Sequence, residues 1–282
     1  MLSGKIYKWL ALLLGSGACM VNVAPAQATE AMCPGGANQD PAVIWCDDFE
    51  DATPLQDKYY EFNDVNGGFE RSNSDSFNGD YSLRARWKAG EVDVGHLMYN
   101  FGRNPIGTQG NADTDFREIY WRFYIKLQDG FSGYPDKLTR ATVFAGANWQ
   151  QAMIAHLWAS TDQREYLMID PASGIDSNSR LATTKWNDFD NLSWLGYKKG
   201  ITPLSAGQWY CIETHVKLNS TGSSDGVFEY WINGKLEAGR QDLNWVKDWA
   251  GYGINSIFLE TYWNSGSPAE QSRYLDKADQ LH

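Results

Sequence analysis

Residues Gly207–Gly234, GQWYCIETHVKLNSTGSSDGVFEYWING, contain two alternating runs joined by a polar turn. Side chains along a strand point to opposite faces in turn, so this pattern predicts a β-hairpin. Residues 219–226 are rich in turn-forming types, and Asn233-Gly234 is a second tight-turn signal. In the first strand the predicted buried face consists of Tyr210, Ile212, Thr214, Val216 and Leu218, and the opposite face of Trp209, Cys211, Glu213, His215 and Lys217.

The same alternation recurs along the rest of the chain. It predicts strands at residues 42–50, 77–88, 116–127, 142–145, 151–158, 165–169, 253–263 and 273–276, and one short helix at 244–249. No long window has helical periodicity. Short strands at this density indicate an all-β protein in which two antiparallel sheets form a sandwich or jelly roll.

Residues 1–28 have the pattern of a signal peptide. Lys5 and Lys8 form a basic start, an apolar run covers residues 9–17, and Ala26-Gln27-Ala28 is a small-residue cleavage site. The apolar run is shorter than the roughly 20 residues that a membrane-spanning helix needs. Lipid attachment at Cys19 is an alternative, although the apolar residue expected three positions earlier is absent. We therefore expect a secreted or periplasmic protein.

Residues 29–282 are expected to form a single domain, because no repeat, low-complexity linker or proline-rich hinge divides them. The chain has a formal net charge of −11, and removal of two leader lysines gives −13. This acidity argues against nucleic acid as a partner. We expect a monomer without a membrane span. Several cationic residues would either form a local basic cleft or lie scattered in solvent. They are Arg117, Arg122, Lys126, Lys137, Arg140, Lys198, Lys199 and Lys217.

Three cysteines follow the leader. In an oxidising compartment Cys33 and Cys46 would staple the N-terminal segment and leave Cys211 unpaired, or Cys211 would pair with one of them. No cysteine and histidine spacing predicts a zinc or haem site.

Several motifs together resemble a known group of proteins. They are CDDFE, SFNGDYSLRARW, REIYWRFYIKLQDGF, GQWYCIETHVKLN, DGVFEYWINGK and RYLD. From Ile44 to Asp276 the pattern resembles the concanavalin A-like jelly rolls, in particular the polysaccharide lyases that include glucuronan lyases, and the fungal cellulose-induced proteins. The resemblance implies the fold, and it suggests a polysaccharide as substrate or ligand. Because this scaffold also carries lectins and glycosidases, activity has to be argued from the site.

The resemblance also implies a structural calcium ion that joins the first and last strands. The matching positions are Glu50, Asp75, Asn78 and Asp276, whose oxygen donors suit calcium. The same side chains are also suited to capping turns or facing water. After Asp276 the sequence KADQLH departs from the apolar closing strand of the group, so we expect either a curtailed strand or an incomplete chain.

Two classes of carbohydrate enzyme can be compared with the residues. A retaining glycosidase needs paired carboxylates, but Glu91-Val92-Asp93-Val94-Gly95-His96 lacks the final acid of the expected motif. A lyase instead needs groups that mask a uronate carboxylate and groups that move a proton. The candidates for those roles are Arg122, Gln151, His156, His215 and Tyr262.

Each of these five residues also has an ordinary structural explanation, such as packing or an ion pair. Gln151 and His156 are five positions apart, so they share a face of their strand only if a bulge lies between them. Trp149, Trp158, Trp186, Trp194 and Trp263 are rings that either stack on sugars or pack in the core. The leading hypothesis is a lyase acting on uronic-acid polysaccharides. The alternatives are a non-catalytic glycan-binding protein and a structural scaffold.

Overall fold

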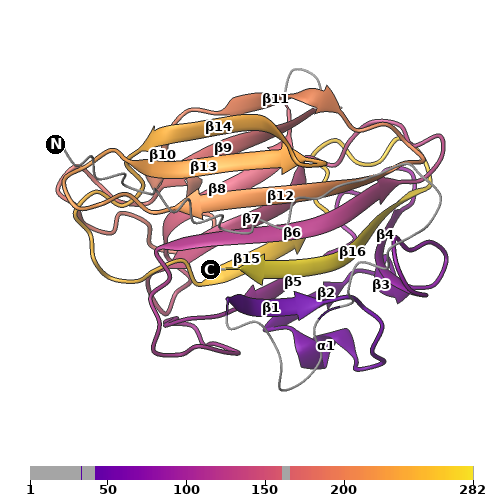
Figure 1. Cartoon of the computed structure of the whole chain (residues 1–282), viewed down its shortest axis with the longest axis horizontal. Helices are drawn as coiled ribbons and strands as arrows, with labels where there is room; N and C mark the ends of the chain where they lie inside the picture. The colour runs from indigo at the N-terminus through magenta and orange to yellow at the C-terminus, as the bar shows by residue number, and fades with distance from the viewer. Residues whose placement is uncertain (1–32, 34–41, 161–165, 282) are drawn as a thin grey trace, which may run out of the picture.

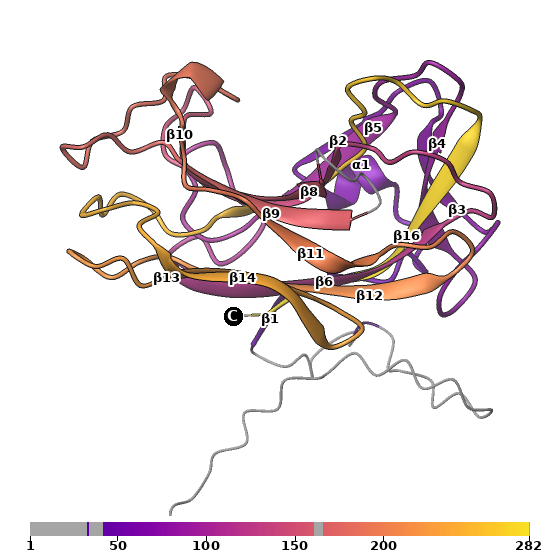
Figure 2. The same cartoon turned by 90° about the horizontal axis from the view of Figure 1, so that it is seen from above.

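The computed structural model describes residue 33 and residues 42–160 and 166–281, with only the backbone described at 278–281. Within these ranges the strands form two eight-stranded antiparallel sheets. Figures 1 and 2 show the sheets packed face to face as two layers. The predicted all-β sandwich is confirmed.

The first sheet, called sheet A, has the strand order β14-β13-β12-β6-β16-β4-β3, with β1 paired to β16. Its strands are β1 (Val43–Asp47), β3 (Phe69–Ser72), β4 (Ser82–Trp87), β6 (Glu118–Leu127), β12 (Trp209–Lys217), β13 (Gly226–Ile232), β14 (Lys235–Leu243) and β16 (Gln271–Leu281).

The second sheet, called sheet B, has the order β10-β9-β8-β7-β15-β5-β2, with β11 paired to β9. Its strands are β2 (Glu61–Asp64), β5 (Gly95–Asn100), β7 (Lys137–Phe144), β8 (Gln151–Ala159), β9 (Tyr166–Ser173), β10 (Ser193–Trp194), β11 (Lys198–Pro203) and β15 (Ser256–Glu260). The described helices are the short α1 (Leu55–Lys58) and the 3-10 turn η1 (Phe189–Asn191).

The hairpin predicted from residues 207–234 is confirmed. Strands β12 and β13 pair with Ile212 opposite Ile232 and Val216 opposite Phe228. These side chains are buried in the core between the sheets. At the tight turn, Asn233 and Gly234 have φ values of 51° and 75°, a region that asparagine and glycine tolerate best.

Two local predictions are wrong. The closing strand is not curtailed, because β16 continues past Asp276 to Leu281 and pairs with β6 and β1. A register shift after Asp276 lets the strand proceed with polar residues. Residues 244–249 do not form a helix. They form turns in which Lys247 has a φ of 52°, while Trp245 is buried in the core.

Cys33 and Cys46 form a disulfide, which confirms one of the cysteine pairings considered from the sequence. Cys211 is buried in β12 and is not a free thiol, so the expectation that it stays unpaired is wrong. The predicted leader and Cys19 lie outside the described residues. Among the described helices, none has the length and apolar character needed to cross a bilayer.

Candidate functional site

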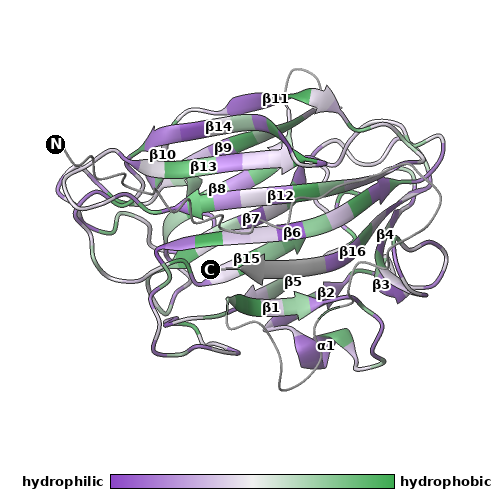
Figure 3. Cartoon of the chain, in the orientation of Figure 1, coloured by the Kyte–Doolittle hydropathy of each residue, from purple (hydrophilic) through white to green (hydrophobic). Residues whose placement is uncertain are grey.

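The five predicted site residues are divided between the outer faces of the two sheets. Arg122 and His215 lie in β6 and β12 of sheet A, where Figure 3 shows hydrophilic residues spaced along the strands. The His215 ring stacks on Tyr120 at 4.1 Å, and its Nε2 lies 2.8 Å from Glu118. The structure therefore does not bring Arg122 and His215 together with the other three candidates, because those residues lie on sheet B.

Gln151 and His156 do share the outer face of sheet B. The pairing of β7 with β8 shifts register between Val143 and Phe144, which is the bulge that their odd spacing requires. As a result, the consecutive residues Ala152 and Met153 both belong to the core.

Strand β7 supplies two cations to the same face. A register shift between Lys137 and Thr139 allows Lys137 and Arg140 to point outward together despite their odd spacing. Arg140 Nη2 lies 3.2 Å from Glu260 Oε1, and Lys137 Nζ lies 3.8 Å from the same oxygen. Glu260 is thus the shared counter-ion of both cations.

Tyr262 reaches this face from the segment after β15. Its neighbour Trp263 is buried in the core, and the Tyr262 carbonyl accepts a 3.0 Å hydrogen bond from the Lys137 N–H. The Tyr262 side chain is consequently directed outward and is 37% exposed. Lys137 Nζ lies 5.1 Å from its ring centroid, so an ammonium group and a phenol adjoin the same space.

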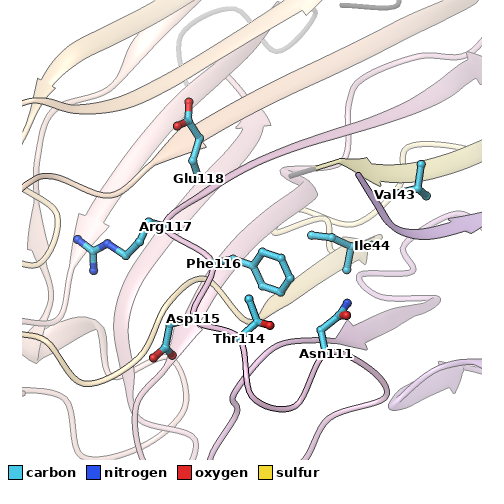
Figure 4. Close-up of a pocket in the computed structure, with 8 residues that line it drawn as sticks. All are labelled: Val43, Ile44, Asn111, Thr114, Asp115, Phe116, Arg117 and Glu118. Atoms are coloured by element: carbon cyan, nitrogen blue, oxygen red, sulfur yellow. The ribbon is translucent and has the colours of Figure 1, made fainter. Parts of the chain in front are cut away.

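A cavity of about 220 Å³ lies at this point. It is lined by Asp93, Gly95, His96, Lys137, Trp186, Asn187, Phe258, Glu260, Thr261 and Tyr262. A larger cavity of about 430 Å³, shown in Figure 4, lies beside β1 and the start of β6 and shares none of these residues. Its charged residues are Asp115, Arg117 and Glu118, and they are engaged by Arg103, by the Asn219 carbonyl and by His215, so the smaller cavity is the better candidate.

Aromatic side chains cover part of this sheet face. The Trp186 ring lies 4.2 Å from the Arg140 guanidinium. It stacks on Phe144 and packs at a tilt against Phe258. Beside it, Asn187 accepts a 3.0 Å hydrogen bond from Arg140 and donates its N–H to Gln151. Apolar rings therefore cover part of this face, and Arg140 is fully buried.

Several buried polar atoms on this face have no hydrogen-bond partner among the described residues. They include Arg140 Nε and Nη2, Gln151 Nε2, His156 Nε2, Trp158 Nε1 and Glu260 Oε2. Buried polar atoms are usually paired because leaving them unpaired is costly. Among the residues that carry these atoms, Glu260 lines the cavity directly, so its free carboxylate oxygen is available to a ligand.

Burial shifts the pKa of several groups here. It lowers the pKa of His156 well below the usual value, and the charge of Arg140 acts in the same direction. Burial also lowers the pKa of Lys137, which Glu260 opposes. Burial raises the pKa of Asp170, whose carbonyl contacts His156 Nδ1, to about 6. His156 is therefore neutral at pH 7 and lies beneath Trp158 and Trp194.

The residues expected to bind calcium meet only in part. Glu50 Oε1 accepts hydrogen bonds from the N–H groups of Asp80 and Tyr81, and Asp276 Oδ2 accepts them from Phe77 and Asn78. Burial raises the pKa of Asp276 to about 6, and the charge of Glu50 adds to this effect. Two neighbouring carboxylates of this kind suit a hard cation.

Asp75 departs from the expected ligand set. Its carboxylate lies 2.8 Å from Lys126 Nζ, while its carbonyl accepts a hydrogen bond from Ser82. Within the described ranges, no group of three or more acidic, histidine or cysteine side chains is arranged to hold a metal ion. Any cation here would therefore depend on Glu50, Asp276 and neutral oxygens.

Sequence reasoning named Lys137 and Arg140 only as members of a possible basic cleft, and it missed Asn187 as a site residue. The two bulges hid the common face of β7 and β8, because strict alternation separates residues at odd spacing. Asn187 lies outside the strands in a turn with a φ of 47°, and no periodic pattern marks it.

No protein-family profile and no curated protein sequence matches this chain. Solved structures do match. An endo-β-1,4-glucuronan lyase from the fungus Trichoderma reesei is 14% identical with a TM-score of 0.58, covering 85% of this chain and 95% of its own. A marine alginate lyase from Aplysia kurodai is 11% identical with a TM-score of 0.60, covering 85% and 98%. An alginate lyase from a Chlorella virus is 14% identical with a TM-score of 0.54, covering 79% and 99%.

At such low identity these likenesses show the fold alone. The chain has the jelly-roll fold of the polysaccharide lyases, as its sequence motifs suggested.

Proposed function

We propose that this protein is a polysaccharide lyase that cleaves uronic-acid-containing glycans at the outer face of sheet B. The observation that carries the proposal is the convergence of Lys137 and Tyr262 on one cavity that Glu260, with its unpaired Oε2, also lines. The fold shared with glucuronan and alginate lyases supports the same reaction class.

The reaction determines the roles of these residues. In β-elimination the proton on C5 of the uronate is removed, a C4=C5 double bond forms, the C4–O bond breaks, and the departing oxygen takes up a proton. The C5 proton is weakly acidic, so the adjacent carboxylate must be neutralised by a cation or hydrogen-bond donors. Lys137, with the Asn187 amide beside it, would neutralise the carboxylate.

Tyr262 would carry the proton. In its deprotonated form, the exposed phenol oxygen would accept the proton from C5 and then donate it to the departing oxygen, which regenerates the starting state. His156 and Arg140 are fully buried in this conformation, so neither would touch the sugar. Arg140 would position Asn187, whose N–H in turn bonds Gln151.

The test is ultraviolet absorbance of the unsaturated uronate during incubation with glucuronan, alginates and glycosaminoglycans. We expect absorbance to rise on at least one of these polysaccharides. The absence of any rise across the panel, with a correctly folded protein, would contradict the proposal.

A second candidate function is glycan binding without catalysis. The observation that favours it is the cover over Arg140, whose two amino groups already contact Asn187 and Glu260. Retention on an immobilised polysaccharide together with no absorbance change would support this function over the lyase.

Calcium also remains a proposal. Glu50 and Asp276 would bind it between the first and last strands and the loop that precedes β4, with a structural rather than a catalytic effect.

A further inference from the structure

Two large aromatic side chains stand exposed beside the candidate site. Phe189 in η1 is 43% exposed and Trp194 in β10 is 44% exposed. Their ring planes are 17° apart and their centroids 6.2 Å apart. Exposed aromatic rings grouped in this way mark interaction surfaces more often than single exposed residues do.

The segment that carries these rings is well anchored. Asp188 is buried and its carboxylate accepts hydrogen bonds from the Thr184 N–H, the Thr184 hydroxyl and the Asn191 amide. Leu192 packs against Ile154 and Ala172 on the face of sheet B. Figure 2 shows β10 and the turn before it standing beside β8 and β9. The pair is therefore preorganised, which reduces the entropy lost on binding.

The rings continue the candidate site without a break. Trp194 lies 6.2 Å from Trp158, and Trp158 lies 6.0 Å from Lys137 Nζ. Lys137 in turn adjoins Tyr262. A path of aromatic and cationic groups thus runs from Tyr262 to Phe189 along one face of the sheet, as an extended ligand requires.

We propose that Phe189 and Trp194 form a stacking subsite for a pyranose ring of the bound polysaccharide, at a distance from the linkage that is cleaved. A pyranose with equatorial substituents exposes axial C–H groups on both faces, and these flat apolar faces pack well on aromatic rings. The ligand class is accordingly a β-linked, gluco-configured chain. This inference rests on the proposed lyase function, which concerns the part of the same bound chain that is cleaved.

The test compares Phe189→Ala with Tyr197→Ala as matched control. Tyr197 is 62% exposed in the same segment. Phe189 is the better test residue because, unlike Trp194, it does not pack on His156. On a ladder of glucuronan oligosaccharides, Phe189→Ala should raise KM about three- to tenfold for long chains. It should leave kcat and the KM of the shortest cleaved chain unchanged, and the control should match the wild type throughout.

An unchanged KM at every length, or an equal rise at every length, would overturn the subsite. Binding of cellohexaose and of glucuronan hexasaccharide, measured by calorimetry, separates the subsite from the lyase proposal. If the wild type binds but cleaves nothing and Phe189→Ala weakens binding, the subsite stands and the lyase fails. If the wild type cleaves glucuronan and Phe189→Ala binds and cleaves as well as it does, the lyase stands and the subsite fails. A wild type that neither binds nor cleaves contradicts both.

Should Phe189→Ala misfold, which its melting curve would show, Trp194→Gln replaces it. This variant removes the other ring of the pair, and only its calorimetric binding of the two hexasaccharides is then used as the test. Weaker binding of either hexasaccharide supports the subsite, and unchanged binding overturns it.

Discussion

Arg273 of β16 crosses the core of the sandwich and donates a 2.6 Å hydrogen bond to the main-chain carbonyl of Glu260 in the opposite sheet. A second, longer bond of 3.4 Å reaches the carbonyl of Lys137. Sheet A thereby holds the backbone of two residues that line the candidate site on sheet B. Burial lowers the pKa of Arg273 to about 9, which indicates that its charge is poorly solvated.

Arg273→Met should lower the free energy of unfolding by about 1–3 kcal/mol, because both carbonyls lose a charged donor. Urea denaturation at pH 7 would measure the change, with Arg273→Lys as the variant that keeps the charge. If Arg273→Met were as stable as the wild type, the cost of burying the charge would outweigh its hydrogen bonds.

Tyr262→Phe should lower kcat by about 10²- to 10⁴-fold, since the phenol is the proposed proton carrier. Binding should persist, because the phenyl ring retains the contact with Lys137. Initial rates of ultraviolet absorbance and calorimetric binding to the same polysaccharide would separate the two effects. Equal kcat values for the variant and the wild type would remove Tyr262 from the mechanism.

His215→Gln is the matched test of which sheet carries the chemistry. His215 contacts Glu118 and Glu229 on the outer face of sheet A, away from the cavity. The substitution should reduce the free energy of unfolding by about 1–3 kcal/mol, because His215 is buried, and leave turnover unchanged. A large loss of turnover in a stably folded variant would move the active site to sheet A.

Asp170→Asn tests the half-buried carboxyl group of the residue that pairs with His156 across β8 and β9. The pKa of Asp170 is about 6 in the folded protein, above its ordinary value of 3.8. The folded state thus holds this proton more tightly, so the contribution to stability is complete below pH 3.8 and is lost as the pH rises through 6.

Above pH 6 the Asn variant should therefore have a larger free energy of unfolding than the wild type. The difference is at most about 3 kcal/mol, and solvent screening reduces it. Below pH 4 the two should converge. Urea titrations across this pH range would check it, and parallel stability curves would contradict the assignment.

Calcium should raise the melting temperature of the wild type in proportion to the logarithm of its concentration above Kd. Asp276→Asn should abolish most of this rise by removing the buried carboxylate. Scanning calorimetry with calcium and with a chelator would measure both. Magnesium serves as the control ion, because it favours a tighter octahedral geometry. An identical melting temperature with calcium and chelator would exclude calcium binding at Glu50 and Asp276.

The sequence predicted the fold well because burial on one face of each strand imposes a strict period of two. The runs at residues 116–127 and 207–234 show this clearly, and they became β6 and the β12–β13 hairpin. Alternation identifies two faces, but it does not say which of the two sheets has the functional outer face. The polar side of β12 was therefore interpreted as part of a site, and in the structure His215 on that side contacts Glu118 and Glu229.

The site on sheet B depends on features that a periodic pattern conceals. Bulges place Lys137 on the same face of the sheet as Arg140, and Gln151 on the same face as His156. A turn with positive φ at Asn187 then closes over Arg140. Tyr262 was named from the sequence as a candidate because it lies on the polar face of the regularly alternating run at residues 253–263.

The most direct test is a crystal structure of Tyr262→Phe with a uronic-acid tetrasaccharide from whichever polysaccharide the wild type binds. We expect the sugar on the outer face of sheet B, with a carboxylate within hydrogen-bonding distance of Lys137 Nζ. A sugar bound over His215 on sheet A, or one that leaves Lys137 without contact, would contradict the account.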